Sequence, residues 1–282
     1  MTVTPPDYLL IGHITADLTP NGRIAGGTVS YAARTAAAFG LRVGVLTSTA
    51  AGEPLLDELR PYAEIVCLPA AQTTTFENIY EPEGRKQFVR GVAAPIGVSD
   101  IPAHFLQAPL VHLAPIIGEG DPKIAHLFKN STVLLTLQGW LRRLEPDGRV
   151  RFKRWYDPDA LKSIDIMVFS EEDIVEAPDM EQDFTRSVKN LFITRAEQGG
   201  TYYRTGEPLS YDTPQVEMVN PTGAGDVFAA SLLASLPAMN NDLLRATKVA
   251  ARLGAICVTR PGLEGTPTSE EVQAALQEAV QV

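Results

Sequence analysis

Cysteine and histidine are scarce in this sequence. Its 282 residues include two cysteines and four histidines. Cys67 and Cys257 each lie among apolar residues, a pattern that favours buried, reduced thiols in a cytoplasmic protein over a disulfide. The histidines show none of the spacings typical of zinc ligands. We therefore expect neither a disulfide-stabilised fold nor a zinc centre.

Basic residues and long apolar runs are also lacking. The 24 Lys and Arg residues are outnumbered by 34 Asp and Glu residues, which leaves a formal net charge of −10. Nucleic acids and anionic membranes are usually bound by a basic face, so we expect neither as a partner. No apolar run reaches the roughly 18 residues of a membrane span, and the first residues lack the basic segment of a signal peptide. We therefore expect a cytoplasmic location.

What the sequence does contain is an alternation of strand-forming and helical segments. Hydrophobic residues make up 45% of the chain, enough for a packed core. Strands are predicted at residues 8–14, 42–49, 64–70, 109–115, 131–139, 165–170 and 190–195, and a β-meander at 199–212. Helices are predicted at residues 26–40, 54–62, 123–129, 158–163, 170–177, 223–236, 241–258 and 269–280. This order predicts an α/β fold with a doubly wound, mainly parallel sheet flanked by helices, formed as a single domain over residues 1–282.

One segment interrupts the alternation. Residues 73–90 contain two stretches in which polar and apolar residues alternate, joined by a Glu-Pro-Glu-Gly turn. This pattern is typical of a β-hairpin with one face in water. We expect the hairpin to lie apart from the parallel sheet, as a lid or as an oligomer contact.

The loops that follow strands are the first place to search for function, because doubly wound sheets bind ligands at the carboxyl ends of their strands. Five such loops are predicted, at residues 12–27, 138–140, 170–173, 194–200 and 221–226. The last one carries the clearest chemical signal.

In that loop, Gly223, Ala224 and Gly225 precede Asp226 at the start of a predicted apolar helix. The first turn of a helix has unpaired amide N–H groups and the positive end of the helix dipole, and small residues let an anion approach them. Asp226, directly behind this anion hole, is placed to accept a proton from a hydroxyl while the hole holds a phosphoryl group. The alternative is that Asp226 only complements the helix N-terminus.

The stretch Asn220–Leu236 resembles the C-terminal signature of the ribokinase-like (PfkB) carbohydrate kinase family, whose core reads Asp-Thr-x-Gly-Ala-Gly-Asp. Residues 223–226 match this core in type, whereas Asn220 and Pro221 replace its first two residues. These two replacements weaken any inference of a monovalent-cation site beside the anion hole.

The N-terminal region supports the same resemblance. Gly12, Asp17 and the pair Gly26-Gly27 before a small-residue helix follow the order of the family's N-terminal region. The resemblance therefore spans nearly the whole chain. It implies the family's doubly wound sheet with a small β lid, made here from residues 17–24 and 73–90.

The resemblance also implies roles for individual residues. Asp226 is the general base on the acceptor hydroxyl, and Gly223, Ala224 and Gly225 form the anion hole. Acceptor contacts are implied for Asp17, Gly26, Gly27, Thr28, Asn78, Gln87 and Gln138. Plainer alternatives are a helix N-cap for Thr28 and solvent-facing positions for Asn78 and Gln87.

Nucleotide contacts are implied for Thr194, Arg195, Gly199, Thr222, Gly223 and Gly225. Here the family's Thr-x-Gly reads Thr194-Arg195-Ala196. The family's Asn-x-x-Glu near the magnesium ion reads Ser170-Glu171-Glu172-Asp173, so a water-mediated contact from Asp173 to Mg²⁺ is expected in its place.

The activity implied is an ATP- and Mg²⁺-dependent kinase that phosphorylates a hydroxyl of a sugar or polyol, cyclitols such as inositol included. One alternative is a nucleoside kinase on the same fold, with Tyr31, Phe76 or Tyr80 as the shelf for the base. Another is a catalytically silent sugar-binding or regulatory protein. The expected partners are the small-molecule acceptor and ATP, together with a second copy of the chain if the lids pair as in the family's dimers.

Overall fold

The computed structural model describes residues 4–81 and 84–281. Nine strands form its central sheet: β1 (Tyr8–Ile11), β4 (Val43–Ala50), β5 (Ala63–Ala70), β8 (Leu110–Leu113), β9 (Thr132–Thr136), β12 (Ile166–Ser170), β13 (Asn190–Thr194), β14 (Gly200–Arg204) and β15 (Glu207–Tyr211). Their order is β15-β14-β13-β12-β9-β8-β1-β4-β5. From β13 to β5 the neighbours pair in parallel, and β14 and β15 add an antiparallel ribbon at one edge. The predicted fold class is confirmed.

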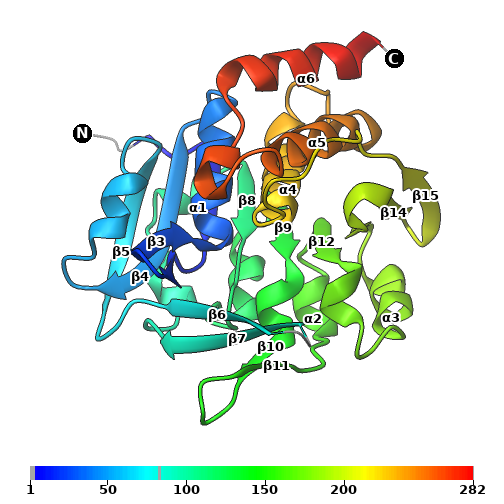
Figure 1. Ribbon diagram of the computed structural model, residues 1–282. Coiled ribbons are helices and arrows are strands. Elements are labelled where there is room, and N and C mark those ends of the chain that lie inside the picture. Colours follow the sequence, from blue (N-terminus) through cyan, green and yellow to red (C-terminus); the bar gives the residue numbers. More distant parts are fainter. Residues whose placement is uncertain (1–3, 82–83, 282) are drawn as a thin grey trace.

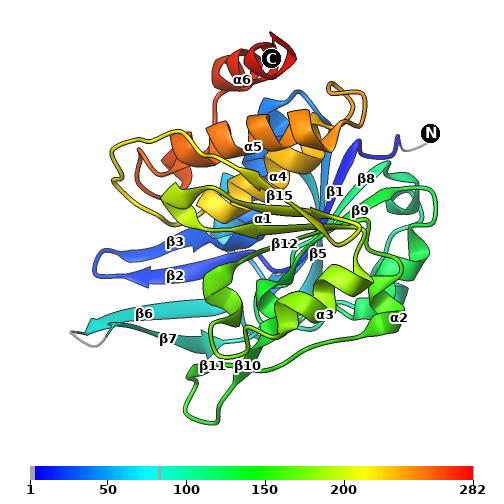
Figure 2. The same cartoon turned by 90° about the vertical axis from the view of Figure 1, so that its right-hand side faces the viewer.

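Helices cover both faces of this sheet. The helices are α1 (Gly27–Ala38), α2 (Pro158–Leu161), α3 (Met180–Ser187), α4 (Ala224–Ser235), α5 (Leu243–Cys257) and α6 (Ser269–Gln281). Figure 2 shows α4, α5 and α6 on one side of the sheet and α2 and α3 on the other. Alternate residues of β1 point to the two faces of the sheet. Tyr8 and Leu10 pack into the core under α1 and α4, whereas Leu9 and Ile11 pack into the core under α3.

None of the helices among residues 4–81 and 84–281 has the length and apolar character needed to cross a membrane.

A second sheet lies beyond one end of the central sheet (Figure 1). Its strands are β2 (Thr15–Thr19), β3 (Gly22–Gly26), β6 (Thr75–Glu81) and β7 (Gly84–Gly91), in the order β3-β2-β6-β7. The predicted hairpin at 73–90 is therefore confirmed as β6 and β7, with Pro82 and Glu83 of its turn outside the described residues. Parallel pairing of β2 with β6 joins the two predicted lid segments, 17–24 and 73–90, in one sheet.

Several local predictions were wrong. The segments predicted as helices at 54–62, 123–129 and 170–177 form only the short 3₁₀ helices Pro54–Glu58, Pro122–Leu127 and Glu171–Ile174, which are common as short connectors. The sequence analysis missed α3 and a hairpin of β10 (Arg142–Leu144) and β11 (Val150–Phe152). Cys67, expected to be buried, is exposed because β5 is an edge strand.

A buried carboxylate holds two loops together at the carboxyl edge of the sheet. Glu119 is 6% exposed. Its two oxygens accept hydrogen bonds from the backbone N–H groups of His13 (2.9 Å), Ile116 (2.9 Å) and Ile117 (2.8 Å). These amides belong to the loops that leave β1 and β8. Glu119 therefore fixes the place where β1 ends and the second sheet begins.

We expect Glu119→Gln to lower the free energy of unfolding by about 1–3 kcal/mol, because the new amide NH₂ would face backbone N–H groups that need an acceptor. Chemical denaturation measures the change. Glu58→Gln, at an exposed position, is the control and should leave stability within about 0.5 kcal/mol of the parent. Equal stability of the two variants would contradict the role given to Glu119.

Candidate active site

The anion hole is formed where α4 begins. Gly223 is the N-cap of α4 and has a left-handed backbone conformation with φ +90°. A Cβ atom on Gly223 would lie 2.1 Å from the ring of Tyr31 in α1, so only glycine fits there. A Cβ atom on Gly225 would meet nothing within 4 Å. The amides of the first turn of α4 therefore face open space on the side of Gly225, as an anion site requires.

Asp226 lies in the first turn of α4, directly behind this hole. Burial raises the pKa of its carboxyl to about 6. A hydrogen bond from the Thr28 hydroxyl and the positive charge of Arg142 act in the opposite direction, while the negative charges of Asp173 and Asp17 raise the pKa further. Asp226 is partly exposed, and an accessible carboxylate that titrates near neutral pH is typical of a general base.

Asp17 approaches from the second sheet. A Cβ atom on Gly26 would lie 2.3 Å from one Asp17 carboxylate oxygen, so the glycine makes room for this carboxylate. The negative charges of Asp226 and Asp17 both contribute to a raised pKa of the Tyr31 phenol, after the larger effect of burial. Tyr31 therefore lies within electrostatic reach of both carboxylates, and the predicted base and the predicted acceptor ligand share one site.

Asn78 and Gln87 are opposite each other on β6 and β7, and the Gln87 amide N–H donates to the Asn78 oxygen at 3.1 Å. The strand register places both on the same face of the second sheet as Asp17 and Phe76. Arg90 lies on the opposite face, where it pairs with Glu77 at 2.6 Å. The face that carries Asp17 is thus lined by uncharged amides and an aromatic ring.

The predicted residues Gln138 and Asp173 contact each other. The Gln138 side chain donates to Asp173 Oδ1 at 2.9 Å, and Asp173 Oδ2 accepts from the Ser170 backbone N–H at 2.9 Å. Each carboxylate oxygen keeps a further lone pair. These contacts fix both side chains between the ends of β9 and β12.

Arg142 is a site residue that the sequence analysis missed. Its guanidinium group donates to the Ile116 carbonyl at 3.1 Å, lies 5.9 Å from the centre of the Phe76 ring, and acts on Asp226 through its charge. The predicted loop after β9 ended at Trp140. The short 3₁₀ helix Leu137–Leu141 turns the chain so that Arg142, two residues later, comes back to the site. Only the three-dimensional structure reveals this turn.

Among the residues expected to contact the nucleotide, Thr194 is the last residue of β13 and Arg195 follows it. The Arg195 guanidinium pairs with Glu171 at 3.0 Å and donates to the Thr201 hydroxyl at 2.6 Å. Gly199 has φ +76°, and a Cβ atom there would lie 2.0 Å from the Tyr211 carbonyl oxygen. The Thr222 backbone N–H donates to the Asn220 side chain at 2.8 Å, which shapes the turn before the anion hole. Thr194, Arg195 and Gly199 therefore lie at the end of β13 and in the turn after it, and Thr222 lies in the turn before α4.

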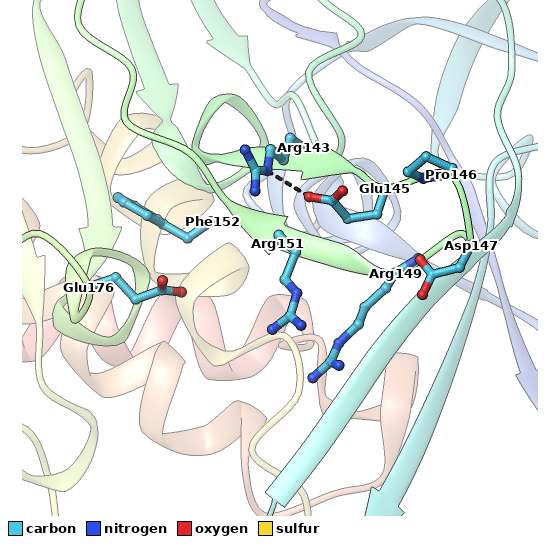
Figure 3. Close-up of a pocket in the computed structure, with 8 residues that line it drawn as sticks. All are labelled: Arg143, Glu145, Pro146, Asp147, Arg149, Arg151, Phe152 and Glu176. Carbon is cyan, nitrogen blue, oxygen red and sulfur yellow. Dashed lines mark hydrogen bonds and ion pairs between the residues drawn. The ribbon is translucent and has the colours of Figure 1, made fainter.

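A cavity of about 650 Å³ lies on the β10–β11 hairpin, and the predicted site residues are elsewhere (Figure 3). Its lining includes Arg143, Arg149 and Arg151 together with Glu145, Asp147 and Glu176. Arg143 forms an ion pair with Glu145 at 2.8 Å. Three cations and three anions leave the cavity without an excess of either charge, so its chemistry does not favour an anionic substrate.

Comparison of the sequence with known proteins finds similar kinases. A sequence profile described as pfkB family carbohydrate kinase matches residues 159–270. The chain is 28% identical over 251 residues to a cytidine kinase of Thermococcus kodakarensis, an alignment that covers 81% of this chain and 87% of that protein.

Two solved structures share the fold. A pyrophosphate-dependent kinase in the ribokinase family, complexed with a pyrophosphate analog and myo-inositol, matches with a TM-score of 0.79 and 22% identity over 95% of this chain and 99% of that one. The ribokinase of Arabidopsis thaliana, complexed with ribose and ATP, matches with a TM-score of 0.75 and 17% identity over 97% of this chain and 99% of that one. The two structures show the same fold, and the profile match agrees with the resemblance seen in the sequence.

The two glycines of the anion hole should respond differently to the same substitution. Gly223→Ala should lower the free energy of unfolding by about 1–3 kcal/mol, because its methyl group would overlap the Tyr31 ring and φ is left-handed. Gly225→Ala should leave stability unchanged or raise it by about 0.5–1 kcal/mol, since it adds a better helix former. The same methyl group should still lower kcat/KM about tenfold or more by crowding the amides. Denaturation and steady-state kinetics of both variants test this, and a Gly225→Ala variant with full activity would argue against the hole.

Proposed function

We propose that this chain, a phosphotransferase of the ribokinase-like (PfkB) carbohydrate kinase family, transfers the γ-phosphoryl group of ATP to a hydroxyl of a sugar or polyol. The observation that carries the proposal is the position of Asp226. Its carboxylate, with a pKa of about 6, lies directly behind a helix N-terminus that is open to an anion on the side of Gly225.

The reaction follows from this arrangement. The oxygen of the acceptor hydroxyl attacks the γ-phosphorus of ATP, and Asp226 accepts the proton that this hydroxyl loses. The bond between the γ-phosphorus and the bridging oxygen breaks, and ADP leaves with that oxygen. The first-turn amides of α4 stabilise the negative charge on the transferred group, and Arg142 contributes a positive charge near Asp226.

The acceptor is bound on the face of the second sheet that carries Asp17. A carboxylate accepts hydrogen bonds from two neighbouring hydroxyls, and the amides of Asn78 and Gln87 both donate and accept. Gly26 and Gly27 let the acceptor approach the backbone, and Gln138 borders the same space from the 3₁₀ helix after β9. This set of groups suits a polyhydroxylated ring, and the solved structures with ribose and with myo-inositol bind acceptors of this kind.

A nucleoside is the second candidate acceptor. The observation in its favour is the alignment with a cytidine kinase over 81% of this chain. Phe76 lies on the same face of the second sheet as Asp17, but its ring is 3% exposed and packs with Val89 and Ile116. Tyr31 is 3% exposed and packs beneath Gly223, so its ring face is already covered.

The donor is assigned as ATP and not pyrophosphate because of an apolar surface next to the anion hole. The segment before Asn220 lies along the end of α5, where the backbone N–H groups of Val219 and Asn220 both donate to the Val258 carbonyl. Val216, Met218 and Val219 are 42%, 63% and 62% exposed there. An apolar surface of this kind suits a nucleobase and has no use in binding inorganic pyrophosphate.

The residues near the site also fit a magnesium ion carried by the nucleotide phosphates. Asp173 is already hydrogen-bonded to Gln138 and Ser170, so its remaining lone pairs are suited to ordered waters of the ion, which keeps much of its hydration shell. No group of three or more His, Cys, Asp or Glu side chains within the described ranges is arranged to hold a metal on its own. The bound ion would neutralise charge on the phosphates of ATP.

The second sheet acts as the lid of a single-domain enzyme in this proposal. Its inner face carries Asp17, Asn78 and Gln87, whereas its outer face carries the half-exposed Leu18 and Ile79. A second copy of the chain covers these apolar residues if two lids pair in a homodimer.

We assign the protein to the cytoplasm, where ATP and free thiols are both maintained.

The deciding experiment measures ADP release with ATP and Mg²⁺ against a panel of sugars, polyols, cyclitols and nucleosides. A parallel set with pyrophosphate as donor measures phosphate release. The proposal expects turnover with ATP and a sugar or polyol. Preference for a nucleoside would favour the second candidate acceptor, turnover only with pyrophosphate would contradict the donor, and no turnover with any pair would favour a silent binding protein.

Asp226→Asn should lower kcat by about 10²- to 10⁴-fold, the usual effect of removing a general base. Binding of ATP, measured by calorimetry, should change little, because the amides of the hole remain. Asp57→Asn, at an exposed position, is the control for the loss of one negative charge. A kcat of the Asp226→Asn variant near that of the parent would remove Asp226 from the role of base.

Hydrogen exchange tests the lid. The amides of residues 76–81 and 84–88 should exchange more slowly when the acceptor is added, because the acceptor would pack against the face of the second sheet that carries Asn78 and Gln87. Nucleotide alone should have a smaller effect. Strong protection in the free protein would favour a dimer interface at these strands, and equal exchange with and without acceptor would leave the lid unsupported.

A further inference from the structure

His13 is a fully buried histidine at the junction of the two sheets. It is 0% exposed and lies in the loop between β1 and β2. Its Nδ1 atom is 2.7 Å from the Thr74 hydroxyl oxygen, and its Nε2 atom is 2.9 Å from the Ala94 carbonyl oxygen. Its backbone N–H donates to Glu119 at 2.9 Å. One residue is therefore bonded to three segments that lie 61, 81 and 106 positions away along the chain.

The partners of the His13 side chain define the direction of each hydrogen bond. The Ala94 carbonyl can only accept, so Nε2 of the imidazole carries a hydrogen and donates it. Nδ1 therefore accepts from the Thr74 hydroxyl, and the Thr74 oxygen in turn accepts from the Ala93 backbone N–H at 3.0 Å. Every group in this His13 network is paired, and a buried network that is fully paired holds its members in one arrangement.

All the connections between the second sheet and the rest of the fold pass the His13 network. Within residues 4–81 and 84–281 the chain makes four such connections, at residues 12–14, 26–27, 71–74 and 92–97. His13, Thr74 and Ala93 come from three of them. At the remaining one, a Cβ atom on Gly27 would lie 3.5 Å from the His13 carbonyl oxygen. The second sheet is thus attached to the central sheet around one side chain.

Each strand that carries an expected acceptor contact begins or ends close to the His13 network. Asp17 lies on β2, which begins shortly after His13. Asn78 lies on β6, which begins directly after Thr74, and Gln87 lies on β7, which ends shortly before the third segment of the network. The positions of these three acceptor contacts relative to the anion hole therefore depend on how firmly the network holds the strands.

Resting on the proposed function, we propose that His13 is a positioning residue that holds the second sheet over the acceptor site. Because it is fully buried, it does not touch the acceptor or the reacting atoms. It acts by keeping Asp17, Asn78 and Gln87 in the arrangement that binds the acceptor. Without the network the second sheet would leave this arrangement for part of the time, and the acceptor affinity would fall in proportion to the time that remains.

The test breaks the network at Thr74, because His13→Ala would open a cavity at a fully buried position. Thr74→Val keeps the shape and leaves Nδ1 of His13 without a donor, whereas Thr74→Ser restores the hydroxyl. The matched control is Tyr8→Phe. The Tyr8 hydroxyl lies 2.9 Å from Nδ1 of His112, which is also 0% exposed but belongs to β8 in the central sheet. Thr74→Val and Tyr8→Phe should each lower the melting temperature by about 2–8 °C.

Hydrogen exchange without any acceptor measures how firmly the second sheet is held. In Thr74→Val the amides of residues 75–81 and 84–91 should exchange about tenfold faster than in the parent, because local opening of these strands becomes easier. Thr74→Ser should exchange at the parent rate, and Tyr8→Phe should leave these amides unchanged although it is also less stable. Parent-like exchange in Thr74→Val, or an equal increase in Tyr8→Phe, overturns the inference.

Steady-state kinetics tests the link to acceptor binding. The acceptor used is the compound of the activity panel, with D-ribose, D-fructose, myo-inositol and cytidine among its members, that the parent phosphorylates fastest. Thr74→Val should raise the KM for this compound about tenfold, while kcat and the KM for ATP stay within about twofold of the parent. Thr74→Ser and Tyr8→Phe should keep the parent values. An unchanged KM for the acceptor in Thr74→Val, or an equal rise in the KM for ATP, overturns the inference.

The two measurements separate this inference from the proposed function. If no compound of the panel is phosphorylated, the proposed function fails, while the exchange experiment still supports or overturns the attachment of the second sheet through His13.

Discussion

The site depends on the contact between α1 and α4 at their N-termini. Gly223 begins α4 with a left-handed conformation against the ring of Tyr31, a place where any side chain would overlap that ring. This close approach places the first turn of α4, which carries Asp226, against α1. The same first turn of α1 follows Gly26, which leaves room for the carboxylate of Asp17. One glycine contact thus brings together the anion hole, the base and the acceptor side.

The electrostatics of the site oppose the stability of the fold. An enclosed Asp226 near two other carboxylates, Asp17 and Asp173, is less stable in its ionised form than a carboxylate in water. Proteins commonly keep such unfavourable groups at functional sites when the surrounding structure holds them in place. Here the hydrogen bond from Thr28 and the charge of Arg142 keep the pKa near 6 and not higher. The positive end of α4 also provides a local site for anions in a chain whose net charge is −10.

Parts of the fold and site were predictable because their signals are local. The alternation of apolar strands and helices predicted the doubly wound sheet, and the period-two pattern of residues 73–90 predicted the hairpin of the second sheet. The run Gly223–Asp226 showed a helix start with bare amides. Arg142 was missed because a short 3₁₀ helix changes the chain direction after Trp140, and no periodic pattern marks such a turn. Glu119 was missed because a buried carboxylate that accepts only backbone N–H groups looks the same in sequence as an exposed one.

The sequence by itself determined the layers, the hairpin and the residue types at the anion hole, since each follows from hydrophobic period or from the backbone freedom of glycine. The tertiary structure decided which side chains meet. Asp17 and Asp226 are more than 200 positions apart, and Gln138 contacts Asp173 only because β9 and β12 are neighbours in the sheet. Packing partners that are distant along the chain leave no mark in a local sequence pattern, so these contacts could be known only from the tertiary structure.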